Sequence, residues 1–80
     1  MNDEQIESRI GQLVAEEERI RGAEAAGEAD DATRARLHRL KVELDVWWDL
    51  LRRRRAAREF GQDPDAVEPR DQEIVESYWQ

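Results

Sequence analysis

Apolar side chains in the first third of the chain recur at the spacing of an α-helix. The row steps by four, three and seven residues, with Val14 beside it: Ile6, Ile10, Leu13 and Ile20. This period places the row on one helix face, whereas a half-buried strand would need strict alternation. Asn2 is suited to cap the start, with Gln5 at the reciprocal position of a capping box, and Gly27 is suited to end the helix. The pattern predicts a helix over residues 3–26.

A second and more regular apolar row follows in the middle of the chain. Its steps of three, four, three and four residues form a heptad row: Leu37, Leu40, Leu44, Trp47 and Leu51. Such a row is the contact face of a helix that packs along a partner helix, and Trp48 lies beside it. Asp30 is placed to cap this helix and Gly61 to end it. We predict a second helix over residues 31–60.

The linker between the two predicted helices is short, so the helices must run antiparallel. With the turn centred near residue 28 or 29, the numbers of facing residues add to about 57. Four apolar pairs fall on this register: Ile20 with Leu37, Leu13 with Leu44, Ile10 with Trp47, and Ile6 with Leu51. Glu17 falls opposite Leu40, and we expect its carboxylate to reach the edge of the row; a buried functional carboxylate is the alternative. The predicted fold is all-α, an antiparallel two-helix hairpin that is coiled-coil-like.

The second helix carries a further apolar stripe that the hairpin contact does not use. Val42, Val46 and Leu50 recur every fourth residue on a face directed away from the heptad row, flanked by Trp48. A second apolar stripe indicates another contact surface. We therefore expect a homodimer, most simply a helical bundle with the second helix against its mate, while an unidentified protein partner is the other occupant considered.

The last part of the chain, residues 61–80, is predicted to form a turn and a short docked segment. The sequence DPDA, residues 63–66, is typical of a turn, and Pro69 suits the first position of a short helix. Apolar and aromatic side chains then recur four residues apart: Ile74 with Tyr78, and Val75 with Trp79. A segment with these side chains is expected to pack on the hairpin or on a second copy.

Charge is distributed unevenly along the chain, whose formal net charge is −7. Residues 1–31 carry −7, residues 32–60 carry +5 and residues 61–80 carry −5. A basic middle between acidic ends favours neutralisation within the chain. The predicted register pairs the start of the first helix with the arginine run: Asp3 with Arg54, Glu4 with Arg53, and Asn2 with Arg55.

The alternative role for the arginine run is contact with nucleic acid. Four side chains would make the phosphate contacts: Arg52, Arg53, Arg55 and Arg58. Trp47 is explained by the hairpin contact, however, and the chain as a whole is acidic. We therefore favour internal pairing of the arginines, and nucleic acid is not the expected partner.

The sequence contains no pattern typical of an enzyme. Phosphate-binding glycine loops, paired-histidine metal motifs and cysteine nucleophiles are all missing, and the chain has no cysteine. His38 is the one histidine and falls outside the heptad row, so we expect it to face solvent. Residues 16–18 are consecutive glutamates that fan around a helix and do not converge on one metal ion. We expect no cofactor, no metal, no small-molecule substrate, no membrane span and a cytoplasmic location.

Three stretches resemble a family of small actinobacterial proteins. These stretches are LVAEEERIR, ELDVWWDLLRRRRAAREFGQDPD and IVESYWQ, and together they carry the resemblance over nearly the whole chain. The family is catalogued as domain of unknown function family 2630. Glu18 stands where its members often have histidine. The resemblance implies a small helical cytoplasmic protein and supplies no catalytic residue. We expect a non-enzymatic interaction or regulatory module.

Overall fold

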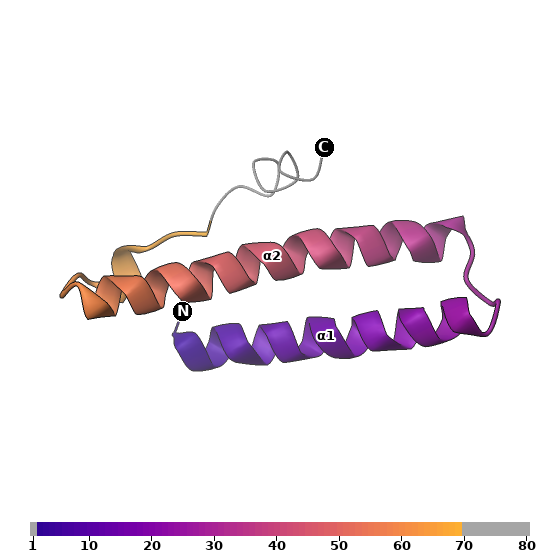
Figure 1. Cartoon of the computed structure of the whole chain (residues 1–80), viewed down its shortest axis with the longest axis horizontal. Helices are drawn as coiled ribbons and strands as arrows, with labels where there is room; N and C mark the ends of the chain where they lie inside the picture. The colour runs from indigo at the N-terminus through magenta and orange to yellow at the C-terminus, as the bar shows by residue number, and fades with distance from the viewer. Residues whose placement is uncertain (1, 70–80) are drawn as a thin grey trace.

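The chain forms an antiparallel pair of long α-helices (Figure 1). The structure is a computed structural model that describes residues 2–69. Helix α1 spans Asp3–Ala25, helix α2 spans Asp31–Glu59, and a short 3-10 helix, η1, spans Pro64–Ala66. The predicted all-α hairpin is confirmed, and each α-helix begins at the expected residue and ends one residue earlier than expected. No strand occurs within the described residues.

Side-chain caps start both helices, as their sequences predict. The Asn2 side chain accepts a hydrogen bond from the backbone N–H of Gln5 at 2.8 Å, and the Gln5 side chain accepts one from the Asn2 N–H at 2.9 Å. The Asp30 carboxylate accepts hydrogen bonds from the backbone N–H and the hydroxyl of Thr33. These caps satisfy N–H groups that have no partner inside the helix, and they fix where each helix begins.

Both helices end at a glycine in the left-handed region of backbone space. Gly27 has φ 74° and Gly61 has φ 71°, values that cost glycine little because it has no Cβ. In each case the residue after the glycine donates its N–H to a carbonyl of the last helical turn, at 2.8 Å after Gly27 and 2.7 Å after Gly61. This pattern, a Schellman motif, stops each helix and turns the chain back on itself.

The helices meet along a row of facing apolar side chains, which we call the seam. The buried side chains that form this core are Ile6, Ile10, Leu13, Leu40, Leu44, Leu50 and Leu51. Side chains packed against the core are Val14, Ile20, Trp47 and Val67. All apolar members of the four predicted pairs except Leu37 belong to this set, and Leu37 is itself buried. Among the described residues after α2, Val67 is the one that packs against this core.

Ion pairs confirm the predicted register of the two helices. Asp3 and Arg54, whose numbers add to 57, form an ion pair at the end of the seam. Arg58 also pairs with Asp3, and three further interhelical pairs flank the seam: Arg9–Glu43 and Arg36–Glu16 along one edge, and Arg55–Glu7 along the other. The two residue numbers of each pair add to 52 on the first edge and to 62 on the second. These sums lie equally far below and above 57, so the flanking pairs agree with the register of the seam.

Glu17, the charged residue that interrupts the apolar row of the seam, lies at the edge as expected. Leu40, which the register places opposite, is fully buried, whereas the Glu17 side chain is 21% exposed. The Glu17 carboxylate pairs with Arg21, one helical turn further on, at 3.4 Å. The carboxylate therefore stays in contact with water and with a cation. A buried functional carboxylate is not present at this position.

The seam register predicts a measurable coupling between two leucines. Leu13→Ala and Leu44→Ala should each lower the free energy of unfolding by about 2–5 kcal/mol, because each empties a buried position in the middle of the seam. In a double-mutant cycle measured by urea unfolding, the two changes should be non-additive, because the side chains share one contact. Ser8→Ala on the exposed side of α1 is the matched control and should change stability little. Strict additivity of the two leucine changes would count against direct contact.

Candidate interaction surface

Arg54 joins α1, α2 and η1 at one end of the hairpin. Its side chain is buried, and it is the one buried charged residue among residues 2–69. Its Nε donates to Asp3 Oδ1 at 2.7 Å, its Nη1 to the Pro64 carbonyl at 2.9 Å, and its Nη2 to Asp65 Oδ1 at 3.1 Å. Hydrogen bonding to Asp3 raises the pKa of Arg54, so the guanidinium stays charged. One buried cation thus holds three segments together.

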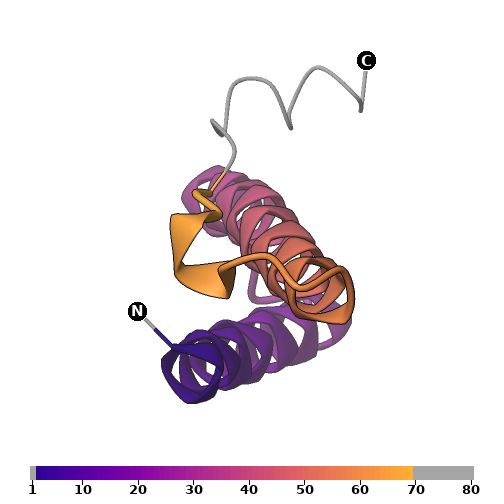
Figure 2. The same cartoon turned by 90° about the vertical axis from the view of Figure 1, so that its left-hand side faces the viewer.

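Residues 61–69, which we call the strap, fold back along α2 from this junction. Figure 1 shows the strap running back beside the last turns of α2, and Figure 2 shows η1 lying beside α2 at the end where α1 begins. Val67 packs against the core, and Arg53 Nη2 donates to the Glu68 carbonyl at 2.6 Å. A small cavity of about 190 Å³ lies under the strap. Its lining residues are Ile6, Leu50, Arg54, Asp65, Val67 and Pro69.

Three other arginines at this end of α2 also have partners within the hairpin. Arg53 pairs with Asp49 at 2.9 Å, one turn earlier on α2. Arg55 pairs with Glu7 at 3.2 Å, and Arg58 pairs with Asp3. Arg52 is exposed. The prediction that this run is neutralised inside the chain is therefore confirmed for these three side chains and for the Arg54 junction.

Two of the predicted pairings are wrong in detail. Arg53 does not pair with Glu4, and Arg55 pairs with Glu7 while Asn2 caps α1. The physical reason is the rotation of about 100° per residue, because residues whose numbers add to 57 face each other only on the seam itself. Away from the seam such residues point to opposite edges or to solvent. Only Asp3 and Arg54 occupy seam positions, and only that predicted pair forms.

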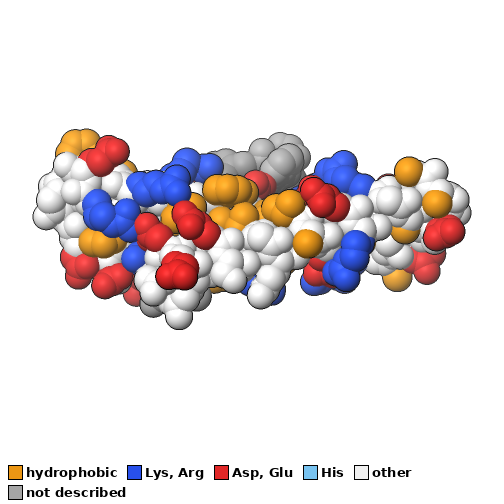
Figure 3. Space-filling model, turned by 90° about the horizontal axis from the view of Figure 1, so that it is seen from below, with side chains coloured by type: hydrophobic (Ala, Val, Ile, Leu, Met, Phe, Trp, Pro, Cys, Tyr) orange, Lys and Arg blue, Asp and Glu red, His pale blue; other side chains and the backbone are white. Residues whose placement is uncertain are grey.

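Charges of both signs alternate on the face of the hairpin formed by α1. Figure 3 shows basic and acidic side chains interspersed along its length, with apolar groups near the middle. A nucleic-acid groove would require a continuous field of positive charge, and no field of a single sign extends along this face. The ion pairs Arg9–Glu43 and Arg36–Glu16 account for part of this alternation. Arg36 lowers the pKa of the Glu16 carboxyl.

The second apolar stripe of α2 divides into two parts. Leu50 is 3% exposed and belongs to the hairpin core, so the expectation that the hairpin leaves it uncovered is wrong. The reason is that its position on the helix is close enough to the seam to be reached by α1 and the strap. Val42 and Val46 are 4% and 6% exposed and are not part of the core cluster. Trp48 is 41% exposed and lies on the other side of α2 from Leu50.

Four residues expected at this surface lie outside the part of the chain that the structure describes. They are Ile74, Val75, Tyr78 and Trp79.

Phe60, at the end of α2, is a further exposed aromatic residue that the sequence pattern did not assign to a surface, with 79% of its area accessible.

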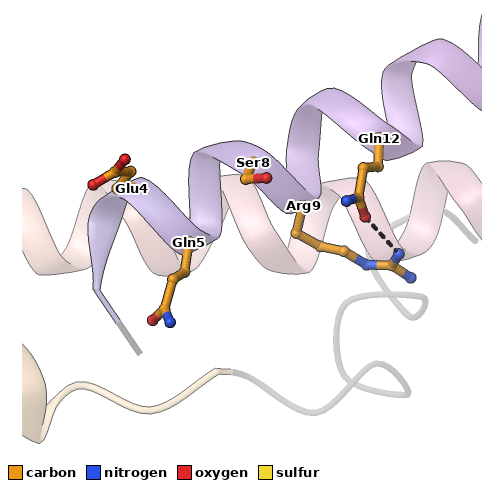
Figure 4. Close-up of a pocket in the computed structure, with 5 residues that line it drawn as sticks. All are labelled: Glu4, Gln5, Ser8, Arg9 and Gln12. Carbon is orange, nitrogen blue, oxygen red and sulfur yellow. Dashed lines mark hydrogen bonds between the residues drawn. The ribbon is translucent and has the colours of Figure 1, made fainter.

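A shallow hollow runs beside the first three turns of α1. It measures about 370 Å³, and its lining residues are Glu4, Gln5, Ser8, Arg9 and Gln12. Figure 4 shows that all five side chains come from α1 and that Arg9 donates to Gln12, a bond of 3.4 Å. Arg9 is held at the same time by Glu43 at 2.8 Å. The hollow is polar and open, and its one basic group is already paired.

The remaining candidate residues are placed as the sequence predicts. His38 is exposed on α2. Of the three consecutive glutamates, Glu16 pairs with Arg36, Glu17 pairs with Arg21, and Glu18 is exposed, so they point in different directions. No group of three or more potential metal ligands occurs within residues 2–69. No helix in the described part of the chain is long and apolar enough to cross a membrane.

Two ion pairs along the seam were missed by the sequence reasoning. Arg9–Glu43 and Arg36–Glu16 each join residues one position before a seam residue on both helices. In an antiparallel pair of helices such positions meet along one edge. Oppositely charged residues whose numbers add to 52 could therefore have predicted these two ion pairs. The contacts of the strap had no comparable signal, because two of them end on backbone carbonyls.

Comparison with known proteins identifies a family of unknown function and relatives that are also uncharacterized. Residues 2–80 match the family described as "Protein of unknown function (DUF2630)". The chain is similar to the uncharacterized proteins Mb0922c of Mycobacterium bovis and Rv0898c of Mycobacterium tuberculosis. Each is 39% identical over 77 residues, covering 95% of this chain and 88% of the relative. No solved structure matches the chain.

The Arg54 junction predicts an acid-labile fold. Hydrogen bonds from Arg54 and Arg58 hold the pKa of the Asp3 carboxyl below its ordinary value. A lowered pKa contributes stability that is present above the ordinary carboxyl pKa of about 3.9 and is lost as pH falls through the folded-state value. Asp3→Asn should therefore reduce stability at neutral pH and flatten the acid limb of the pH–stability curve, measured by urea unfolding between pH 7 and pH 2.

Glu18→Gln on the exposed side of α1 is the matched control, since it also removes one carboxylate. It should leave the acid limb of the curve as steep as in the parent protein. Equal acid limbs for the parent and Asp3→Asn would show that the junction does not contribute to stability.

Proposed function

This chain belongs to the DUF2630 family, and we propose that it is a non-enzymatic protein–protein interaction or regulatory module. The observation that carries the proposal is the second apolar stripe of α2. Val42 and Val46 are buried apolar side chains outside the cluster that joins the two helices. Small domains gain stability by burying such a stripe against a further segment or partner. No described side chain has an arrangement that favours catalysis over this role.

The proposed partner is a second copy of the chain. An α-helix with apolar residues on two faces is typical of a bundle, in which it packs against more than one neighbour. A two-fold dimer would bring the α2 outer faces together, so that Val42 and Val46 of both copies form one core. Trp48, which is 41% exposed, projects from α2 on the side away from Val46, so it would lie outside this contact.

The proposed place of action is the cytoplasm. Small secreted domains of this length are usually stapled by disulfides, and this chain has no cysteine. The proposed module needs no cofactor, metal or small-molecule substrate, because its contact surface consists of side chains of α2.

Nucleic acid is not the proposed partner, and this is testable. Arg53, Arg55 and Arg58 are occupied by carboxylates of the same chain, and the net charge of the protein is −7. We expect no binding to duplex DNA or to RNA tighter than tens of micromolar near physiological salt, measured by fluorescence anisotropy over a salt series. Micromolar or tighter binding with a steep salt slope, abolished by Arg52→Glu but not by His38→Glu, would reverse this proposal.

The proposed dimer is tested by a charge placed in the stripe. Val46→Glu should weaken the dimer at least tenfold, because the new carboxylate would be buried without a partner in the two-fold contact. Ala56→Glu is the matched control, since it adds the same charge at an exposed position of α2 and should leave dimerisation unchanged. Sedimentation equilibrium gives the association constant, and circular dichroism checks that helical content survives. A protein that stays monomeric up to about millimolar concentration would refute the dimer directly.

A further inference from the structure

The strap ends beside the second stripe of α2. The chain is fixed as far as Glu68 by Arg54 on the Pro64 carbonyl, by Val67 in the core and by Arg53 on the Glu68 carbonyl. Pro69 then lines the same small cavity as Leu50. The described chain therefore ends beside Leu50, after running back along α2 toward its earlier turns, as Figure 1 shows.

The stripe begins where the strap ends. Val46 lies one turn before Leu50 on α2 and Val42 lies one turn before Val46, so the farther valine is about 12 Å along the helix from Leu50. Residues 70–80 follow Pro69 directly. Eleven residues span at most about 36 Å when extended and about 16 Å when helical, so either form reaches both valines.

The composition of residues 70–80 matches an apolar stripe on a helix. Four apolar or aromatic side chains recur there at a spacing of four residues: Ile74, Val75, Tyr78 and Trp79. The intervening positions are acidic or polar, which suits a segment with one face toward α2 and the other toward water. Asp71, Glu73 and Glu76 carry charges opposite to those of Arg39 and Lys41, which flank the valines in the sequence of α2.

We propose that residues 70–80 occupy the Val42–Val46 stripe of their own chain and thereby compete with a second copy for it. This inference rests on the proposed function, because it names the device that regulates the same contact. A segment tethered by a few residues has an effective concentration of about millimolar, whereas a second copy in solution is present at micromolar concentration. The tethered segment therefore holds the stripe at low protein concentration. The burial of both valines within a single chain agrees with this arrangement.

Competition has a measurable consequence for dimerisation. If the segment covers the stripe in roughly nine molecules of ten, each copy is competent about one tenth of the time, and the dimer Kd rises about a hundredfold. Removing the segment removes this penalty. The opposite consequence follows if the segment crosses to the stripe of the second copy, because its removal would then take contacts away from the dimer.

The test compares the full chain with a chain that ends at Pro69 by sedimentation equilibrium. We expect the shorter chain to dimerise at least tenfold more tightly. A length-matched variant, Tyr78→Ser with Trp79→Ser, should behave like the shorter chain, while Gln72→Ser with Gln80→Ser is the matched control and should behave like the parent. Unchanged or weaker dimerisation of the shorter chain would overturn the competition.

A disulfide experiment separates this inference from the proposed dimer. The chain has no cysteine, so Val46→Cys with Val75→Cys introduces the one possible pair. We expect oxidation to form this disulfide within one chain, giving a monomer of increased mobility on a non-reducing gel. This result is expected whether or not the full chain and the chain that ends at Pro69 dimerise. Glu18→Cys with Val75→Cys, on the exposed side of α1, is the control and should not close. Failure of the first pair to close, or closure only between chains, would overturn docking within the chain.

Discussion

The buried guanidinium of Arg54 is the constraint on which the rest of the described structure depends. A cation removed from water is costly unless acceptors replace the water around it, and no single helix can supply them. Here they come from Asp3 at the start of α1, from the Pro64 carbonyl and from Asp65. No buried side-chain nitrogen or oxygen in the described residues lacks a hydrogen bond. Helix pairing and strap folding are therefore coupled, since each supplies part of what Arg54 requires.

The same ion pair determines how far one helix can slide along the other. An apolar seam repeats every seven residues, so aliphatic rows alone would meet again after a slide of one heptad. A slide in one direction would set the charge of Arg54 against Ile10, and a slide in the other would carry Arg54 beyond the start of α1. The flanking pairs would be broken by either slide, because Arg9–Glu43 and Arg36–Glu16 depend on one sum of residue numbers. Polar contacts thus give the hairpin a single register, while apolar contacts give it stability.

The parts of the fold that the sequence reveals are those decided by neighbouring residues. Caps, glycine ends and helical periodicity all act within a few positions, so the helices and their seam could be predicted, as Asn2 and Gly61 illustrate. The pairing of Asp3 with Arg54 follows from the seam, but the neighbouring predicted pairs do not form because each residue away from the seam is rotated by about 100° around its helix. The strap could not be predicted, since the positions of the Pro64 and Glu68 carbonyls arise only after the turn has folded. The same holds for Leu50, whose burial depends on that strap.

Among the residues described, the arginine-rich end of α2 serves to organise the chain. Helix α2 has two apolar faces, and the hairpin uses one of them in full. What happens at the other face depends on where the chain goes after Gly61, and Arg53 and Arg54 decide this by holding the carbonyls of the strap. The arginine cluster resembles a binding site for an external polyanion, but its side chains pair with acceptors inside the chain. Its effect on function is therefore indirect. It directs residues 61–69 back along α2, so the same contacts that fix the hairpin also set where Pro69 lies, beside Leu50.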